Sequence, residues 1–253
     1  MRAAAGVALV ASLFSPASDA VTNGRDAADL STANEAGQRA MLTHRADELS
    51  GPEADRIASN DNRTPAGTFK NGVLELTLEV RTGMWFPESE KGASVPIQAF
   101  AEAGKASSTP GPLIRVPEGT EIRLTLRNTL SDSAVLVFGL HTRPSASPDE
   151  GVLVPANGSR RLQFAAGAPG TYYYWGTTTH NGIRDRMEVE SQLSGAFVVD
   201  PRSQRARLDD RIFVIGVWIE PPSTVNGVEK LPREVLVING KSWPHTERFT
   251  FTE

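Results

Sequence analysis

The chain has 253 residues, of which 39% are hydrophobic, so it can hold one large domain or two small ones. Its formal net charge of -4, without blocks of like charge, lacks the basic excess that favours nucleic-acid binding. It has no cysteine, which excludes disulfide bonds and every metal site that needs a thiolate ligand.

The first twenty residues have the pattern of an export signal. A short basic start is followed by an uncharged apolar run from Ala3 to Phe14, and Ser18-Asp19-Ala20 places small residues where a signal peptidase cleaves. The apolar run is too short to span a bilayer. We therefore expect residues 1–20 to be a signal peptide and the protein to be periplasmic or secreted, without a membrane span. A frayed apolar N-terminus is the alternative.

Residues 21–66 are polar and rich in alanine, and they show no strand pattern. Thr32-Ala33-Asn34-Glu35 has the spacing of a capping box, which predicts a short helix that ends near Ser50-Gly51-Pro52. His44 lies in this helix and is interpreted as a solvated surface histidine. The segment is expected to be a polar, partly helical linker.

From residue 67 onward the sequence predicts short β-strands separated by turns. Alternating apolar and polar residues indicate half-buried strands, while the more continuous apolar run from Ala134 to His141 indicates a strand buried on both faces. No long helical pattern interrupts them, which favours a β-sandwich or Greek-key barrel. The expected strands are Val73–Val80, one within residues 109–120, Glu121–Asn128, Ala134–His141, Arg160–Ala165, Tyr172–Thr177 and Leu193–Val199. The loop around Gly92 and Pro96 is expected to contain no strand.

A second unit is expected after a polar linker that runs from Asp200 to Asp210. Strands are predicted at residues 211–219 and 235–238. The sequence stops at Arg248–Glu253 within an alternating pattern, and a strand without a partner cannot bury its inward face. We therefore expect the protein to continue beyond Glu253, with a C-terminal edge strand as the alternative.

Two histidines close strands of the predicted sandwich. His141 ends one strand, sharing a face with Val135 and Val137 by period two, and His180 follows another. If the strand ends meet at one pole, two imidazoles there could bind copper or zinc. Two ligands are too few for a tight site, so a carboxylate from residues 185–190 or a partner chain would have to complete it. Histidines without a metal are the simpler interpretation from residue types alone.

The remaining chemical patterns are weak. The sequence has no nucleophile elbow, phosphate-binding loop or zinc-protease helix. The acidic residues Asp185, Glu188 and Glu190 are interpreted as a solvated loop. The aromatic run Tyr172–Trp175 is interpreted as core packing, with two side chains pointing into the sandwich.

Several segments occur in an order typical of one protein family. Pro110–Gly119 resembles its P-G-P-x-I-x-x-x-x-G opening, Gly139–Thr142 stands where its H-W-H-G strand lies, and Gly170–Trp175 matches the start of G-T-x-W-Y-H-S-H. Gln192–Asp200 matches the strand that follows, and Val237–Pro244 resembles the I-N-G-x-x-x-P start of a second domain. Over about residues 67 to 253 the chain thus resembles the N-terminal cupredoxin (plastocyanin-like) region of the multicopper oxidases.

The sequence departs from this family at its copper ligands. In the family, two H-x-H pairs of this domain bind type 2 and type 3 coppers. Here Gly139 stands at the first position and His141 keeps the second, while Trp175 and Thr177 replace the other pair. None of these three replacements is an imidazole. His180 is a substitute only if its loop folds back, and Phe138 is a second candidate for the first histidine position.

The resemblance implies an all-β, cupredoxin-like Greek-key sandwich at residues 67–200 and the start of an incomplete second cupredoxin-like domain at residues 201–253. It implies that the full-length protein oxidises a small-molecule reductant and reduces oxygen, with copper as cofactor and His141 and His180 as the candidate metal ligands. This chain alone is expected to be inactive, because a type 1 copper needs a cysteine.

The alternative is a metal-free cupredoxin-like scaffold or binding module. An exported copper-handling protein is less favoured, because the sequence has no methionine-rich or histidine-rich tract. Homo-oligomerisation is left open.

Overall fold

The computed structural model describes residues 7–10, 55–140, 151–203, 210–220, 223–225 and 228–250. All of them belong to one compact unit. The strands are β1 (Val7–Val10), β2 (Arg56–Ser59), β3 (Thr68–Lys70), β4 (Val73–Trp85), β5 (Val95–Glu102), β6 (Ser108–Thr109), β7 (Gly111–Pro117), β8 (Glu121–Asn128), β9 (Val135–Phe138), β10 (Val152–Val154), β11 (Ser159–Ala165), β12 (Gly170–Thr177), β13 (Ser194–Asp200), β14 (Arg211–Glu220), β15 (Ser223–Val225), β16 (Val228–Lys230), β17 (Arg233–Ile238) and β18 (Lys241–Ser242). Among the described residues the helical element is the single 3-10 turn η1 (Glu188–Glu190).

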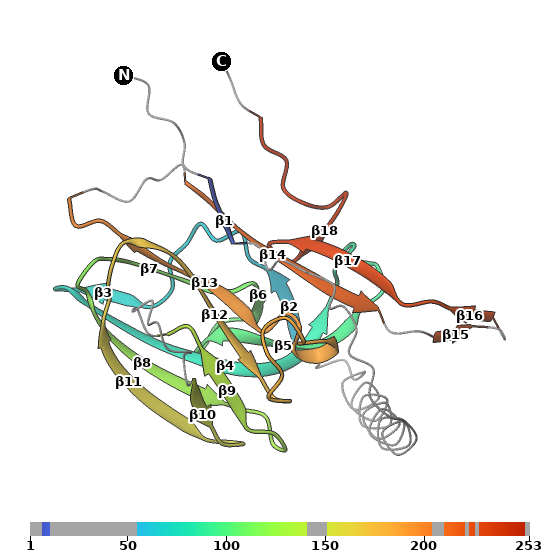
Figure 1. The fold of residues 1–253 in the computed structure, drawn as a ribbon, viewed down its shortest axis with the longest axis horizontal. Coiled ribbons are helices and arrows are strands. Elements are labelled where there is room, and N and C mark those ends of the chain that lie inside the picture. The colour runs from blue at the N-terminus through green and yellow to red at the C-terminus, as the bar shows by residue number, and fades with distance from the viewer. Residues whose placement is uncertain are drawn as a thin grey trace, which may run out of the picture. The chain divides into compact units, whose positions relative to one another are not determined.

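Two β-sheets pack face to face around the main core (Figure 1). One has the strand order β10-β9-β12-β13-β7, and the other β11-β8-β4-β2-β6-β5, with β3 added beside β4. Alternation explains the inward faces, because every second residue is apolar from Leu74 to Val80 of β4 and from Ile122 to Leu126 of β8. The largest buried side chains of this core include Leu74, Leu78, Ile122, Leu124, Leu126, Ile114, Phe100, Tyr174 and Phe197. The predicted β-sandwich is confirmed.

A third sheet, with the order β1-β14-β17-β18, packs on the sandwich. Ile212 and Val214 of β14 pack on the outward face of β7 and β13. Further along the same strand, Trp218 meets Trp85 of β4 edge to face at 6.3 Å. The Trp85 indole also donates to the Gly240 carbonyl at 3.0 Å. The strands after residue 210 are therefore joined to the sandwich by two apolar clusters.

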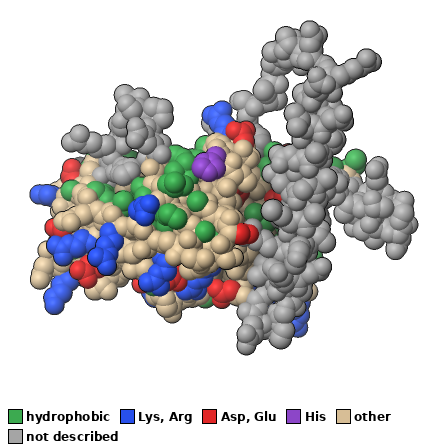
Figure 2. Space-filling view, turned by 90° about the horizontal axis from the view of Figure 1, so that it is seen from below, with side chains coloured by type: hydrophobic (Ala, Val, Ile, Leu, Met, Phe, Trp, Pro, Cys, Tyr) green, Lys and Arg blue, Asp and Glu red, His purple; other side chains and the backbone are tan. Residues whose placement is uncertain are grey.

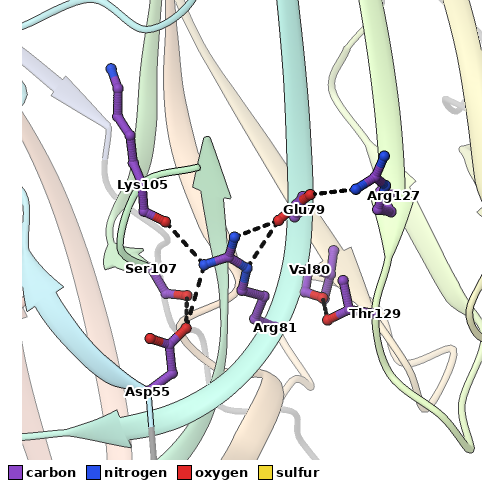
Figure 3. A network of polar contacts seen from close by, with 8 residues as sticks. All are labelled: Asp55, Glu79, Val80, Arg81, Lys105, Ser107, Arg127 and Thr129. Atoms are coloured by element: carbon purple, nitrogen blue, oxygen red, sulfur yellow. Dashed lines mark hydrogen bonds and ion pairs between the residues drawn. The ribbon is translucent and has the colours of Figure 1, made fainter. Parts of the chain in front are cut away.

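Ion pairs reinforce the sandwich at its surface (Figure 3). The Glu79 carboxylate, with 8% of its side chain exposed, accepts from Arg81 Nε at 3.0 Å and from Arg127 Nη1 at 2.9 Å. Arg81 also donates to the Lys105 carbonyl at 2.9 Å. These contacts tie β4 to β8 and to the β5–β6 turn. On the face shown in Figure 2, basic and acidic side chains are interspersed, in keeping with the charge pattern of the sequence.

A second ion cluster lies where the chain passes from the sandwich to the third sheet. Arg115 of β7 donates through two nitrogens to Asp200, both at 2.8 Å, and to Asp210 at 2.9 Å. Its hydrogen bonds to Asp200 raise the pKa of the Arg115 guanidinium, against the opposing effect of burial. Both ends of the segment between Asp200 and Asp210 are thus held by one arginine.

Most predicted strands are confirmed, with bounds shifted by a few residues, but some expectations about strands are wrong. Strands occur in two segments that were expected to hold none: β2 lies within the polar segment and β5 around Pro96. Several short strands were also not predicted, namely β1, β3, β10, β15, β16 and β18. The strand expected from Ala134 to His141 ends at Phe138, and its residues alternate between buried and partly buried instead of being buried on both faces.

The remaining expectations about chain organisation are not tested. The helix expected within residues 21–66 lies outside the described residues. No helix among the described residues is long and apolar enough to span a membrane. Val7–Val10, in the expected signal peptide, pairs in parallel with β14. The signal peptide, the export of the protein and the division into two cupredoxin-like domains stay predictions.

Candidate functional site

One pair of the family's ligand positions, Trp175 and Thr177, lies on β12, and Gly139 of the other pair directly follows the neighbouring antiparallel strand β9. Their register places Trp175 opposite Phe138 and Thr177 opposite Leu136. The rings of Phe138 and Trp175 stack with their centroids 4.3 Å apart and their planes inclined by 14°. Phe138, the last residue of β9, is therefore the residue opposite the first of the two β12 positions.

Arg186 also packs against Trp175. Its guanidinium carbon lies 5.0 Å from the centre of the Trp175 ring, within range of a cation–π contact. Its Nη1 donates to the carbonyls of Gly176, Glu190 and Leu193 at 3.0–3.2 Å. One side chain thus joins the end of β12 to the start of β13 while it covers Trp175.

Gly139 has no room for a side chain. Its φ is +75°, a conformation that L-residues rarely adopt. A Cβ at this position would lie 2.1 Å from the Tyr173 carbonyl oxygen and 2.9 Å from the Tyr174 Cα, both backbone atoms of β12. A histidine at this position would require a different backbone conformation. A simple exchange of a histidine ligand for glycine, with the backbone unchanged, is therefore excluded at residue 139.

Thr177 is engaged with a buried carboxylate. The Glu190 side chain is fully buried, and its oxygens accept from the Thr177 hydroxyl at 3.0 and 3.1 Å. The backbone N–H groups of Thr178 and Thr179 donate to the same carboxylate at 2.6 and 3.1 Å, and the Thr178 hydroxyl lies 3.1 Å from it. We call residues 177–179 the threonine nest; it includes the Thr179 hydroxyl, which also donates to Glu190.

Two of the three tyrosines of β12, Tyr172 and Tyr174, belong to the sandwich core, as predicted. Tyr174 is fully buried, and its hydroxyl donates to the Pro112 carbonyl at 2.6 Å. Burial raises the pKa of the Tyr174 phenol well above its usual value. Tyr172 packs against the same core, while Tyr173 faces the opposite side and packs against the β14 cluster.

Of the two predicted metal ligands, His180 lies among the described residues and His141 does not. His180 follows β12, is exposed and has a φ of +65°. His141 lies outside the described residues. Because β9 and β12 are antiparallel, the chain leaves them in opposite directions. Whether either histidine binds a metal stays a prediction.

The acidic loop also differs from its interpretation. Asp185 is exposed and Glu188 is partly buried, but Glu190 is fully buried beneath the threonine nest. Sequence reasoning missed Glu190 and Arg186 as organising residues of this site. The one available signal was the run of three consecutive threonines directly after an aromatic strand.

The donor set does not fit the copper ions of the family. Trp175 is covered by Phe138 and Arg186, Thr177 is bonded to Glu190, and Gly139 is pressed against β12. Within the described ranges, no group of three or more His, Cys, Asp or Glu side chains could hold a metal ion. Copper prefers imidazole and thiolate ligands, which these positions lack.

A separate polar cleft of about 700 Å³ lies between the loop after β2, the β5–β6 turn and the residues after β17. Its charged side chains largely pair with one another: Arg63 with Glu247, and Lys105 with Glu102 at 2.8 Å. These pairs leave the cleft lined by mixed and mostly neutralised charge.

Several known proteins are similar to part of this chain. The chain is 27% identical over 155 residues to a probable nitrite reductase–hydroxylamine oxidoreductase fusion protein of Kuenenia stuttgartiensis, covering 58% of this chain and 18% of that protein. It is similar to a multicopper oxidase of Campylobacter jejuni, with 19% identity, 76% of this chain and 41% of that chain covered, and a TM-score of 0.49. It is also similar to a copper nitrite reductase of Nitrosomonas europaea, with 23% identity, 51% and 42% coverage, and a TM-score of 0.39.

The chain therefore spans less than half of the length of each of these proteins. Residues 102–204, which contain β6 to β13, match the family described as multicopper oxidase. Together with the sandwich of two sheets, this match identifies the segment as a cupredoxin domain of the multicopper oxidase family.

Proposed function

We propose that this chain is part of an exported, multicopper-oxidase-related oxidoreductase and serves in it as a structural cupredoxin domain that binds no copper at β9 and β12. The family match supports the relationship to the oxidases. The whole protein would oxidise a small-molecule reductant and pass electrons to oxygen, with its coppers held by residues other than those of this strand pair.

One observation carries the structural role of the domain. The two β12 positions that are histidines in the family lie on the outward face of the strand, and here both are committed to protein contacts. Trp175 stacks on Phe138 and lies within cation–π range of Arg186, and Thr177 is hydrogen-bonded to a fully buried Glu190. Replacing a metal site by such packing keeps the strands in place without any ligand, since buried polar groups are stable when they are fully hydrogen-bonded.

A copper titration of the purified 253-residue chain tests the proposal, read by electron paramagnetic resonance and by elemental analysis after desalting. We expect no stoichiometric copper in the wild type, and no difference between the wild type and the variants His141→Ala and His180→Ala. His245→Ala is the matched control, because His245 is an exposed histidine far along the chain from β9 and β12.

The opposite result is equally specific. One copper per chain that is lost in His141→Ala and in His180→Ala, but retained in His245→Ala, would overturn the scaffold role. It would assign the two histidines as copper ligands of this domain.

A further inference from the structure

Glu190 is a buried carboxylate whose partners are neutral. It is fully buried, and its described hydrogen-bond donors are the hydroxyls and backbone amides of Thr177, Thr178 and Thr179. Arg186 lies nearby but donates to the backbone carbonyl of Glu190 rather than to its carboxylate. A carboxylate removed from water is stable only when such donors replace its hydration shell.

The local geometry of the threonine nest suits an anion. Two consecutive backbone N–H groups and three consecutive hydroxyls converge on one carboxylate. Successive N–H groups that point to one side form a concave anion-binding site. The Gln98 side chain, 1% exposed, closes the same site, with its Oε1 3.3 Å from the Thr178 hydroxyl. The Nε2 of this buried amide has no hydrogen-bond partner.

The nest also connects elements that are distant in the sequence. Thr177 ends β12, Gln98 belongs to β5, and Glu190 closes η1. Two residues after Glu190, the Gln192 Nε2 donates to the Val217 carbonyl of β14 at 3.2 Å. The position of Glu190 therefore fixes how β12 is held against both β5 and β14.

We propose that the threonine nest is a carboxylate-binding site that Glu190 occupies within its own chain, and that this contact replaces a metal ion as the crosslink at the end of β12. The inference rests on the proposed function in that Thr177 serves no metal. Removing the Glu190 side chain would leave a vacated site that accepts small free carboxylates, such as formate and acetate.

The first test compares melting temperatures of conservative variants. Glu190→Gln keeps the shape but presents an amide NH₂ to hydrogen-bond donors, so we expect the melting temperature to fall by about 4–10 °C, since an unsatisfied buried polar group has a large cost in a domain of this size. Asp185→Asn, an exposed change in the same loop, is the matched control and should leave the melting temperature unchanged. Thr179→Val should lower it, while Thr179→Ser, which keeps the hydroxyl, should not.

The second test is chemical rescue. In Glu190→Ala, formate or acetate should raise the melting temperature with a saturable dose dependence, while the neutral analogue acetamide, matched in size to acetate, should not. The wild type, whose nest is occupied, should not respond to either anion. If Glu190→Ala folds too poorly to be studied, the comparison of Thr179→Val with Thr179→Ser decides alone.

Two outcomes would overturn the inference: equal melting temperatures for Glu190→Gln and Asp185→Asn, or an acetate response in the wild type equal to that of Glu190→Ala. The failure of the proposed function looks different. In that case the wild type would retain copper, and a chelator would lower its melting temperature whatever the response of the Glu190 variants.

Discussion

Replacing Gly139 with alanine tests whether any side chain can stand at the end of β9. The new Cβ would lie 2.1 Å from the Tyr173 carbonyl oxygen. That atom is part of β12 and cannot rotate away as a flexible side chain would. The alanine would also have to keep a φ of +75°, so the substitution combines backbone strain with a steric clash.

Gly72 is a matched control that separates these two contributions. Its φ is +76°, yet a Cβ there would meet nothing within 4 Å. Gly72→Ala should therefore cost only the left-handed conformation, about 1–2 kcal/mol. Gly139→Ala should cost this and a further ~1–3 kcal/mol, the usual penalty for forcing extra atoms into packed structure. For a protein of this size the added term lowers the melting temperature by about 2–12 °C.

Urea and thermal unfolding, followed by circular dichroism, measure both variants against the wild type. We expect Gly72→Ala to lie between the wild type and Gly139→Ala in both assays. Equal losses for the two alanines would refute the reasoning, because the steric contact with β12 would then contribute nothing. In that case a histidine at residue 139 would again be compatible with this backbone.

Two further predictions concern buried polar groups. Because burial raises the pKa of Tyr174, the unfolded chain loses the phenol proton at a lower pH than the folded chain, so stability should fall as the pH rises above about 10. Tyr174→Phe should reduce the slope of the urea midpoint against pH in this range. An unchanged slope would contradict the assignment. Arg115→Lys keeps the charge but loses the two-nitrogen contact with Asp200, and should lower the free energy of unfolding by about 1–3 kcal/mol in urea denaturation. Arg115→Ala should lower it more, because Asp200 and Asp210 then face each other without a cation; an Arg115→Ala protein as stable as the wild type would show that the cluster contributes nothing.

The sandwich could be predicted because its strands follow a strict period of two. Leu74, Leu76 and Leu78 alternate with polar residues, and burial follows the alternation residue by residue. The alternating pattern did not reveal strands whose burial does not follow a period of two. In β2 only Ile57 is buried, which leaves no period to detect. In β5, Pro96 argues against a strand, yet five consecutive residues are buried because both faces are covered.

The candidate site was harder to predict because it depends on register and on contacts between distant residues. The alternation of residues does not give the register in which β9 pairs with β12. The sequence therefore did not show that Phe138 lies opposite Trp175. The burial of Glu190 arises from a hydrogen bond to Thr177, thirteen positions earlier, across a turn. Nothing in its local sequence distinguishes it from Asp185, which is exposed.

The parallel pairing of β7 with β13 has a consequence for how the chain folds. Arg115 and Asp200, which join these strands at the surface, are 85 positions apart in the sequence. Contacts of such separation form slowly, because a long loop must close before they return any stabilisation. During synthesis β7 therefore stays without its neighbour until β13 has left the ribosome. The sandwich should accordingly acquire its cooperative unfolding transition only when Asp200 is present, as one late event rather than strand by strand.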